Sequence, residues 1–278
     1  MKAALCQMTS SDVPEENLSA ARAMIAEAAA GGAQLVCTPE VTNCVSTSRA
    51  RQEAVLALEE DDATLAGMRE AAREHGIWLS IGSLALKTRD ADGRFANRSF
   101  LISPEGEVTA RYDKIHMFDV QVSDTETYRE SAGYRPGAEA VVAETPLATL
   151  GLTICYDLRF PHLHRGLAKA GAEVILIPAA FSPGTGPGHW EVLLRARAIE
   201  CGAYVLAAAQ TGKHELTEGR PRKSWGHSMA VAPWGEVVLD AGEAPGVFLV
   251  DLDLAQVADV RRRLPALTHD RPYEGPGA

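Results

Sequence analysis

Three residues whose side chains suit covalent acyl transfer stand at the ends of apolar segments. Glu40 follows "LVCTP", Lys114 follows "VTARYD" and Cys155 follows "LTI". Functional groups of α/β proteins gather beyond strand ends, on loops that a rigid sheet positions. A carboxylate can take the proton of a thiol, the thiolate can attack a carbonyl carbon, and an ammonium can stabilise the resulting oxyanion. These residue types therefore predict a nucleophilic acyl-transfer site.

Each of the three residues also has an ordinary structural interpretation. A lone cysteine at a strand end is often a small buried hydrophobic residue. A glutamate after "TP" is often solvated or caps a helix, and a lysine in "YDK" is often a surface charge on a strand edge. The spacing in the sequence leaves open whether the three side chains meet in space, so the prediction depends on the elements that would position them.

Strand-like and helix-like segments alternate along the chain. Strands are predicted at 2–8, 33–39, 77–86, 95–103, 107–114, 140–145, 147–154, 173–178, 203–210, 226–232, 235–240 and 246–252. Helices are predicted at 15–32, 62–75, 161–171, 189–201 and 254–263, and a long irregular polar loop at 115–138. Strand pairs joined by tight turns, combined with helices, indicate mixed sheets. We expect two layers of sheet covered by helices.

Composition excludes several classes of protein. The 278 residues are 46% hydrophobic and carry a net charge of −10, which disfavours a nucleic-acid or anionic-membrane partner. The five cysteines are odd in number and contain no CxxC pair, so neither a disulfide framework nor a structural zinc site is expected. The start of the chain is too short in apolar length for a signal peptide, and no run approaches the roughly 18 apolar residues of a membrane span. The sequence predicts a cytoplasmic globular protein.

Longer segments around the three residues resemble the nitrilase superfamily of carbon–nitrogen hydrolases, and within it the Nit-type amidases. They are "LVCTPE", "RYDKIHMFDV", "LGLTICYDLRFP", "PAAFSPGTGPGHWEVLLRARAIE", "AAAQTGKH", "SWGHSMAVAPWGEVV" and "RRRLPALTHDRP". The likeness implies a single hydrolase domain over residues 1–272 followed by a tail at 273–278. It also implies an α/β fold of four layers, an α-β-β-α sandwich with mixed sheets, whose protomers pair as a homodimer.

The resemblance assigns roles to residues of this sequence. It implies a Glu–Lys–Cys triad at Glu40, Lys114 and Cys155, which needs no metal and no organic cofactor. It implies a second catalytic carboxylate in "YRESAGYRPG" at Glu130, with Glu126 as the competing choice. The ordinary alternative for Glu130 is a solvated loop acid.

Contacts to the substrate follow partly from the resemblance and partly from chemistry. By analogy with the family, the backbone N–H of Tyr156 would join Lys114 in holding the oxyanion. Arg159 is expected to receive a substrate carboxylate, because a guanidinium binds a carboxylate through two parallel hydrogen bonds; an ion pair with Asp157 is the alternative. Thr185 is a weaker candidate for a substrate hydrogen bond, or else a hydroxyl that stabilises its own loop.

The predicted function is that of a cysteine amidase whose partner is a small-molecule amide. The resemblance implies deaminated glutathione as substrate, cleaved through a thioester with release of the amine or ammonia. The alternatives are omega-amidase activity on 2-oxoglutaramate, hydrolysis of N-carbamoyl amino acids, a true nitrilase, and a catalytically silent scaffold.

Three other motifs in the sequence do not predict a functional site. "GHSMA" resembles a serine nucleophile elbow at Ser228, but a turn and a strand follow it where that elbow needs a helix. "GTGPG" at 184–188 lacks dinucleotide-binding spacing. His162 and His164 would point apart on a helix, and a carboxylate ligand has no obvious place beside them.

Overall fold

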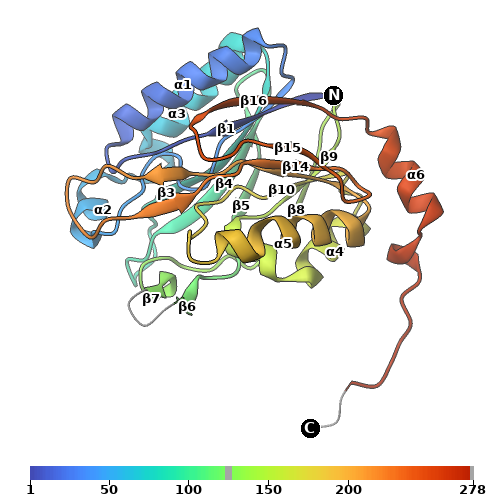
Figure 1. The fold of residues 1–278 in the computed structure, drawn as a ribbon. Helices are drawn as coiled ribbons and strands as arrows, with labels where there is room; N and C mark the ends of the chain where they lie inside the picture. Colours follow the sequence, from blue (N-terminus) through green and yellow to red (C-terminus); the bar gives the residue numbers. More distant parts are fainter. Residues whose placement is uncertain (123–126, 276–278) are drawn as a thin grey trace.

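The computed structural model describes residues 1–122 and 127–275, and its main feature is a pair of six-stranded sheets (Figure 1). The first sheet has the order β16 (Gly246–Asp251), β1 (Lys2–Gln7), β2 (Leu35–Cys37), β3 (Trp78–Leu86), β4 (Ala96–Ile102), β5 (Val108–Asp113). The second has the order β15 (Val237–Asp240), β14 (Met229–Val231), β11 (Tyr204–Ala207), β10 (Val174–Leu176), β9 (Thr149–Leu152), β8 (Val141–Glu144). Two short hairpins pair β6 (Asp119–Gln121) with β7 (Thr127–Arg129) and β12 (Thr211–Lys213) with β13 (Lys223–Trp225).

Both sheets are mixed, and each has a parallel centre. Strands β1, β2 and β3 run parallel to one another, as do β9, β10 and β11. The remaining pairs, β16 with β1, β3 with β4, β4 with β5, β8 with β9, β11 with β14 and β14 with β15, are antiparallel. The carboxyl ends of β2 and β9, which precede Glu40 and Cys155, are therefore ends of central parallel strands.

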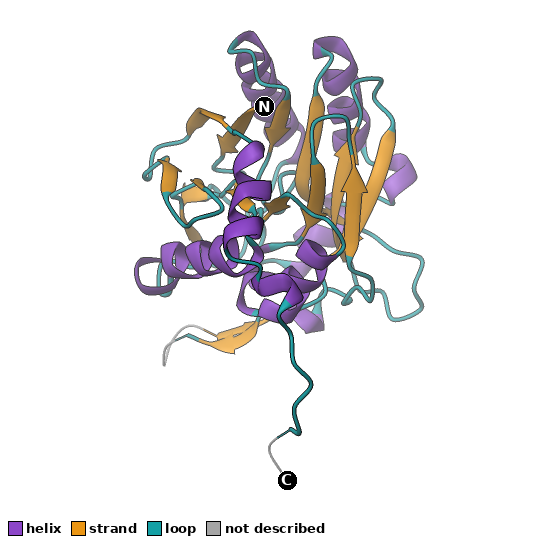
Figure 2. Ribbon diagram, turned by 90° about the vertical axis from the view of Figure 1, so that its right-hand side faces the viewer, coloured by secondary structure: helices purple, strands orange, loops and turns teal. Residues whose placement is uncertain are grey.

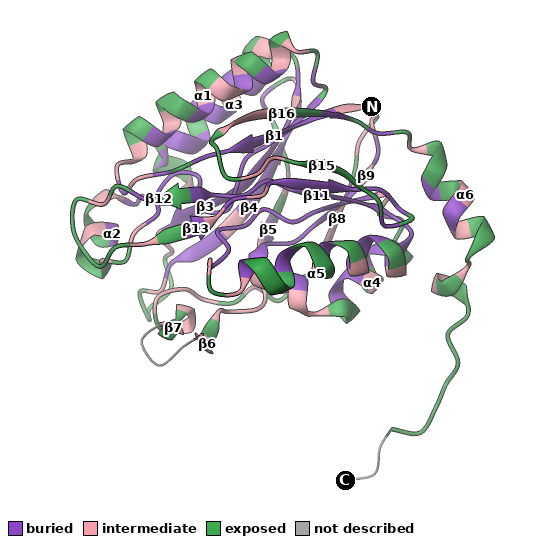
Figure 3. Ribbon diagram, viewed as in Figure 1, coloured by how far each residue is buried: buried purple, intermediate pink, exposed green. Residues whose placement is uncertain are grey.

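The helices cover the outer face of each sheet, which makes four layers. Helices α1 (Pro14–Ala30) and α3 (Ala63–His75) pack on the first sheet, and α4 (Pro161–Lys169) and α5 (Gly186–Cys201) pack on the second (Figure 1). Figure 3 shows the helix faces turned toward the sheets as buried and the outer faces as exposed. The predicted α-β-β-α sandwich with mixed sheets is confirmed.

Strand β1 shows how the sequence produces this layering. Its side chains alternate between faces because successive residues of a strand point to opposite sides. Ala3 and Leu5 are buried in the core between the two sheets, whereas Ala4 and Cys6 are buried in the core under α1 and α3. A strand that is covered on both faces has no solvent side, so its apolar residues form a continuous run.

Several elements differ from the prediction. Helix α2 (Arg49–Val55) was not predicted; it begins after Ser48, whose side chain accepts a hydrogen bond from the backbone N–H of Arg51 at 3.1 Å. The stretch 115–138 contains the β6–β7 hairpin where an irregular loop was expected, and β12 and β13 were not predicted. Most strands are shorter than their predicted ranges by one residue or more. Helix α5 starts at Gly186, three residues before the predicted start.

The end of the chain leaves the sandwich. After α6 (Ala255–Arg263) and a short turn, the chain extends away from the body (Figure 2). Within the residues that the structure describes, no helix is both long and apolar enough to cross a membrane.

Candidate active site

The four predicted catalytic side chains meet at one place. Lys114 Nζ lies 2.9 Å from Oε1 of Glu40 and 2.9 Å from each carboxylate oxygen of Glu130. Cys155 lines the same cavity as these three side chains, near enough for the charges of Glu40 and Lys114 to act on its thiol. Glu40, Lys114 and Cys155 are all nearly inaccessible to solvent. A carboxylate, an ammonium and a thiol that are far apart in the sequence therefore form one contiguous cluster.

Glu40 is positioned by a loop that is fixed to strand β3. The backbone N–H of Thr38 donates to the Ser80 carbonyl at 3.0 Å, and the N–H of Val41 donates to Ser83 Oγ at 2.8 Å. Val41 has φ 47°, a left-handed conformation that is unfavourable for a β-branched residue. Such strain persists only where the surrounding contacts impose it, and it concentrates at functional sites. The loop thus holds the Glu40 carboxylate in a defined place.

The nucleophile stands on a sharp turn between β9 and the 3₁₀ turn η3 (Cys155–Arg159). Cys155 itself has φ 48°, and its N–H donates to the Pro178 carbonyl at 2.8 Å. Asp157, which is fully buried, accepts hydrogen bonds from the N–H of Ile154 at 2.9 Å and from the hydroxyl of Tyr112 at 2.6 Å. These contacts fix the backbone on both sides of the sulfur.

Asn97 on β4 links the two carboxylates. Its Nδ2 donates to Glu40 Oε1 at 3.0 Å and lies 3.4 Å from Glu130 Oε1. Glu130 also accepts a hydrogen bond of 2.6 Å from the N–H of Phe118. Oε2 of Glu40 accepts from the N–H of Ala180 at 2.8 Å. Both carboxylates therefore accept hydrogen bonds from neighbouring N–H groups.

The electrostatics assign a charge to each group of the cluster. Burial opposes ionisation of Glu40, but the charge and the hydrogen bond of Lys114 outweigh it and hold the pKa of Glu40 below its usual value. Burial acts against the charge of Lys114 too, yet Glu130 and Glu40 raise the pKa of Lys114 well above normal. Burial and the negative charge of Glu40 raise the pKa of the Cys155 thiol well above its usual value, against the opposing effect of Lys114. The resting site holds an ionised glutamate, an ammonium and a neutral thiol.

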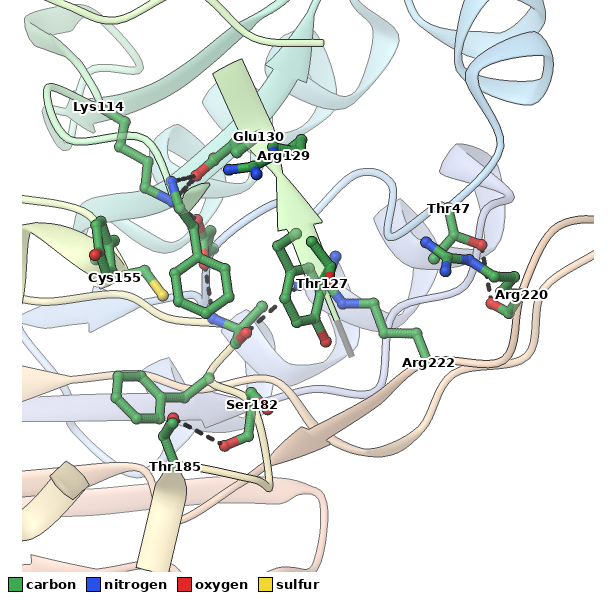
Figure 4. Close-up of a pocket in the computed structure, with 16 residues that line it drawn as sticks. Thr47, Lys114, Thr127, Arg129, Glu130, Cys155, Ser182, Thr185, Arg220 and Arg222 are labelled. Carbon is green, nitrogen blue, oxygen red and sulfur yellow. Dashed lines mark hydrogen bonds and ion pairs between the residues drawn. The ribbon is translucent and has the colours of Figure 1, made fainter. Parts of the chain in front are cut away.

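A cavity of about 210 Å³ lies beside the sulfur (Figure 4). Its lining combines Glu40, Lys114, Glu130 and Cys155 with the aromatic residues Phe118, Tyr128, Tyr156 and Phe181 and the hydroxyl residues Thr47, Thr127, Ser182 and Thr185. Three arginines, Arg129, Arg220 and Arg222, complete the lining. A small pocket with apolar walls and convergent polar groups is the usual form of a small-molecule site.

The structure brings Tyr156 and Thr185 to the cavity wall and leaves Arg159 next to it. The Arg159 guanidinium lies 5.5 Å from the centre of the Phe181 ring and 5.9 Å from that of Tyr156, two wall residues. One of its guanidinium nitrogens lies 3.2 Å from His189 Nδ1. The alternative ion pair with Asp157 is wrong, because Asp157 is satisfied by Tyr112, Ile154 and His116. Glu126 lies outside the described residues.

Sequence reasoning missed Asn97, Thr47 and the three arginines of the cavity. Asn97 is the second residue of β4, and asparagine is uncommon in strands, which was the available signal. The segment that carries Arg220 and Arg222 looks like an ordinary solvated loop in the sequence.

The motifs that the sequence analysis did not assign to the site lie in buried or tightly packed positions. Ser228 Oγ accepts a hydrogen bond from the N–H of Ala209 at 2.8 Å and is fully buried. His164 is buried in α4 with Nδ1 3.1 Å from the Phe160 carbonyl. Gly186 of the "GTGPG" segment packs against Trp225, where a Cβ would come within 2.3 Å of the ring. No group of three or more His, Cys, Asp or Glu within 1–122 and 127–275 is arranged to hold a metal ion.

Comparison with known proteins places these features in a wider group. The carbon–nitrogen hydrolase family profile matches residues 2–262. Deaminated glutathione amidase of Yersinia enterocolitica is 42% identical over 270 residues, which cover 96% of this chain and 92% of that protein. The NitFhit protein of C. elegans superposes with a TM-score of 0.88 at 38% identity; the match covers 97% of this chain and 65% of the NitFhit chain. An amidase mutant from Nesterenkonia sp. AN1, with acrylamide added at its active-site cysteine, has a TM-score of 0.76 at 29% identity, covering 95% of this chain and 98% of that one.

Proposed function

This chain belongs to the carbon–nitrogen hydrolase family and is an amidase, and from this premise we propose that it cleaves a carboxylate-bearing amide through a thioester formed on Cys155. The single observation that carries the proposal is the meeting in one cavity of the Cys155 thiol with the Glu40 carboxylate and the Lys114 ammonium, the last two 2.9 Å apart. A nucleophile, a base and a cation thereby share one cavity with room for a small amide.

Acylation follows from these contacts. The sulfur of Cys155 attacks the amide carbon while the thiol proton passes to Glu40, since a neutral thiol is a poor nucleophile without a base. A C–S bond forms and the carbonyl oxygen takes up the negative charge. The tetrahedral intermediate collapses, the C–N bond breaks, and protonated Glu40 gives its proton to the leaving nitrogen. The amine or ammonia departs and a thioester remains.

Deacylation reverses the roles with water in place of the amine. Glu40 takes a proton from a water molecule, whose oxygen attacks the thioester carbon. The C–S bond then breaks, the carboxylic acid leaves, and the sulfur is reprotonated from Glu40. Each acyl group transferred therefore consumes one water and restores the resting site.

Lys114 and the backbone N–H of Tyr156 are the proposed donors to the oxyanion. Lys114 carries a full charge at the centre of the cluster, and its raised pKa keeps that charge throughout the neutral range. Removal of one oxyanion donor typically lowers the rate by about 10²–10³-fold. Glu130 holds the Lys114 ammonium through both of its oxygens, so we propose that it orients Lys114 and balances its charge.

Deaminated glutathione is the proposed substrate. The relative from Yersinia enterocolitica carries that substrate in its name, and its alignment spans almost the whole chain. The arginines around the cavity suit an acidic substrate, with Arg159 and Thr185 proposed as contacts to a carboxylate and a polar group of the acyl half. The proposal needs no cofactor.

Hydrolysis assays test the proposal. Deaminated glutathione, 2-oxoglutaramate, N-carbamoyl-alanine and a simple nitrile should be compared by kcat/KM, with deaminated glutathione expected to lead. Cys155→Ala should abolish turnover, and hydroxylamine should intercept the wild-type thioester as a hydroxamate. Near-normal turnover by Cys155→Ala would reject the mechanism, and a protein inactive on the whole panel would favour the scaffold alternative.

A homodimer in the cytoplasm is part of the proposal. Helix α5 exposes the apolar side chains of Val192 and Ile199, at 66% and 46% of their areas, which suits a helix that packs against a second copy. Sedimentation equilibrium should give twice the monomer mass. A monomer at micromolar concentration would contradict the pairing.

A further inference from the structure

The active-site cavity continues into a second hollow under the β12–β13 hairpin. This outer hollow has a volume of about 430 Å³ and shares Thr127, Tyr128, Arg220 and Arg222 with the cavity beside the sulfur. Pro183, Gly184, Pro221 and Lys223 complete its lining. A substrate that releases only ammonia needs none of this space.

The shared wall is cationic although the protein is acidic. Within the described part of the chain, Arg220, Arg222 and Lys223 form no ion pair with a carboxylate, whereas the chain as a whole has a net charge of −10. In Figure 4 the Arg222 side chain extends from its loop toward the cavity, and Arg220 lies beside Thr47. Unpaired guanidinium groups around a hollow favour an anionic ligand.

The hairpin that carries these arginines is held firmly by the rest of the protein. Thr47 Oγ1 donates to the Arg220 carbonyl at 2.8 Å, and both the N–H and the hydroxyl of Thr217 donate to Asp12, at 3.0 and 2.8 Å. Gly219 has φ +99°, and a Cβ there would come within 2.5 Å of Thr47 Oγ1. The backbone under the guanidinium groups is therefore preorganised, which lowers the entropic loss on binding.

The position of Arg222 relative to Glu40 identifies which half of the substrate it would meet. Arg222 lies 3.5 Å from the carbonyl of Ala180, whose N–H donates to Glu40, and its charge helps to lower the pKa of Glu40. In the proposed mechanism Glu40 gives its proton to the leaving nitrogen. The amine half of the substrate therefore lies on the Glu40 side of the sulfur, which is the side of Arg222.

We infer that Arg220 and Arg222 bind the carboxylate carried by the leaving amine and thereby make the enzyme prefer a charged leaving group to its neutral counterpart. The inference rests on the proposed function and adds its leaving-group specificity. The terminal carboxylate of deaminated glutathione stays with the leaving amine, and it is the group that this arginine wall would bind.

A matched pair of substrates isolates the subsite. Deaminated glutathione and its C-terminal carboxamide differ only in the charge of the leaving group, so the ratio of their kcat/KM values measures recognition of that carboxylate. Any effect of a substitution on Glu40 itself slows both substrates and cancels in the ratio. We expect the wild-type enzyme to favour the carboxylate about 10- to 100-fold, the usual range for a charge-assisted hydrogen-bonded pair.

Variants of the hairpin complete the test. Arg222→Leu and Arg220→Leu should each lower the ratio, and the double variant should bring it close to one; Arg222→Lys should restore part of it. Lys213→Leu is the control, because Lys213 lies on the same hairpin but pairs with Glu215 at 3.8 Å and lines neither hollow. A wild-type ratio near one, or a ratio unchanged in the double variant, would overturn the subsite while leaving the amidase intact. Failure of the wild-type enzyme on both substrates would instead overturn the proposed function, and the subsite with it.

Discussion

Asn97 donates a hydrogen bond of 3.0 Å to the carboxylate of Glu40, the proposed base. Asn97 is almost fully buried, so this contact is not shared with bulk solvent. A donor to a carboxylate stabilises the ionised form and lowers its pKa. Asn97 therefore helps Lys114 to keep Glu40 ionised, without itself touching the sulfur.

Substitution of Asn97 should shift the acidic limb of the pH profile. In Asn97→Leu the Glu40 carboxylate loses a donor, so its pKa rises and the base becomes protonated at a higher pH. We expect the acidic limb of kcat/KM, which reports the free enzyme, to move upward by about 0.5 to 1 pH unit. An unchanged limb with an equal loss of rate at every pH would assign Asn97 a purely structural role.

Loss of Glu40 should have opposite effects on turnover and on thiol ionisation. The negative charge of Glu40 raises the pKa of Cys155, so Glu40→Gln should lower the pKa of the thiol and let iodoacetamide react at lower pH. Turnover should nevertheless fall by about 10²–10⁴-fold, because the general base is gone. The alkylation rate of Cys155, followed by peptide mass against pH, gives the thiol titration. A midpoint that moves upward in Glu40→Gln would contradict the charge assignment.

Lys114 should contribute strongly to stability at neutral pH. Lys114→Met leaves the buried Glu40 and the partly buried Glu130 without a counter-ion, and loss of one partner of a buried ion pair costs about 3–5 kcal/mol. The folded-state pKa of Glu40 is lowered in the wild type, so its contribution is present above its unfolded pKa of about 4.3 and disappears as the pH falls. In Lys114→Met, the burial of Glu40 is no longer offset by Lys114, so the pKa of Glu40 rises. Glu40 therefore becomes protonated at low pH, and the variant regains part of the lost stability.

Urea unfolding at pH 7 and pH 5 measures this difference. The destabilisation by Lys114→Met should be smaller at pH 5 than at pH 7. Lys213→Met is the matched control, since its ion pair with Glu215 is exposed and such pairs contribute about 0–1 kcal/mol. Equal destabilisation at the two pH values would show that lost packing, not charge, accounts for the effect.

Gly82 should tolerate no side chain. A Cβ at Gly82 would lie 2.1 Å from the Thr38 carbonyl and 2.5 Å from both the Pro39 carbonyl and the Pro178 Cβ. The first two belong to the Glu40 loop, and Pro178 accepts the hydrogen bond of the Cys155 N–H. Gly82→Ala should therefore push the base and the nucleophile apart and lower kcat at least about 10²-fold, since small displacements of reacting groups are costly.

Gly166→Ala in α4 is the control for this substitution. A Cβ at Gly166 meets nothing within 4 Å, and alanine is favoured over glycine in a helix by about 0.5–1 kcal/mol. It should keep full activity and raise the melting temperature slightly. Normal kcat in Gly82→Ala would show that the two loops can separate without harm.

The sequence predicted the layers of the fold because their signals are local. Apolar runs such as 2–8 and turn residues such as Gly31 and Gly32 mark buried strands and helix ends directly. The short hairpins β6–β7 and β12–β13 escaped prediction because three-residue polar strands have no usable periodicity. Helix α2 escaped because "RARQEAV" is short and charged, and tertiary contacts rather than an apolar stripe hold it.

The residues of the candidate site likewise fall into those that local sequence signals predict and those that depend on long-range packing. Glu40, Lys114 and Cys155 stand at strand ends and carry reactive groups, so their positions in the sequence already suggest chemistry. Asn97 and Arg222 acquire their positions only through long-range packing: Asn97 lies opposite Lys114 because β4 pairs with β5, and Arg222 reaches the cavity because Thr47 and Asp12 hold its hairpin. Such contacts cannot be inferred from spacing along one chain.

The acylation state of Cys155 tests the central claim most directly. Wild-type enzyme mixed with excess deaminated glutathione and quenched in acid within one turnover should be digested and analysed by mass spectrometry. We predict that the peptide containing Cys155 carries the mass of the substrate acyl group, that hydroxylamine removes it, and that Cys155→Ala shows no acylated peptide. Steady amide hydrolysis with no acyl group on Cys155, or with the acyl group on another residue, would contradict the account.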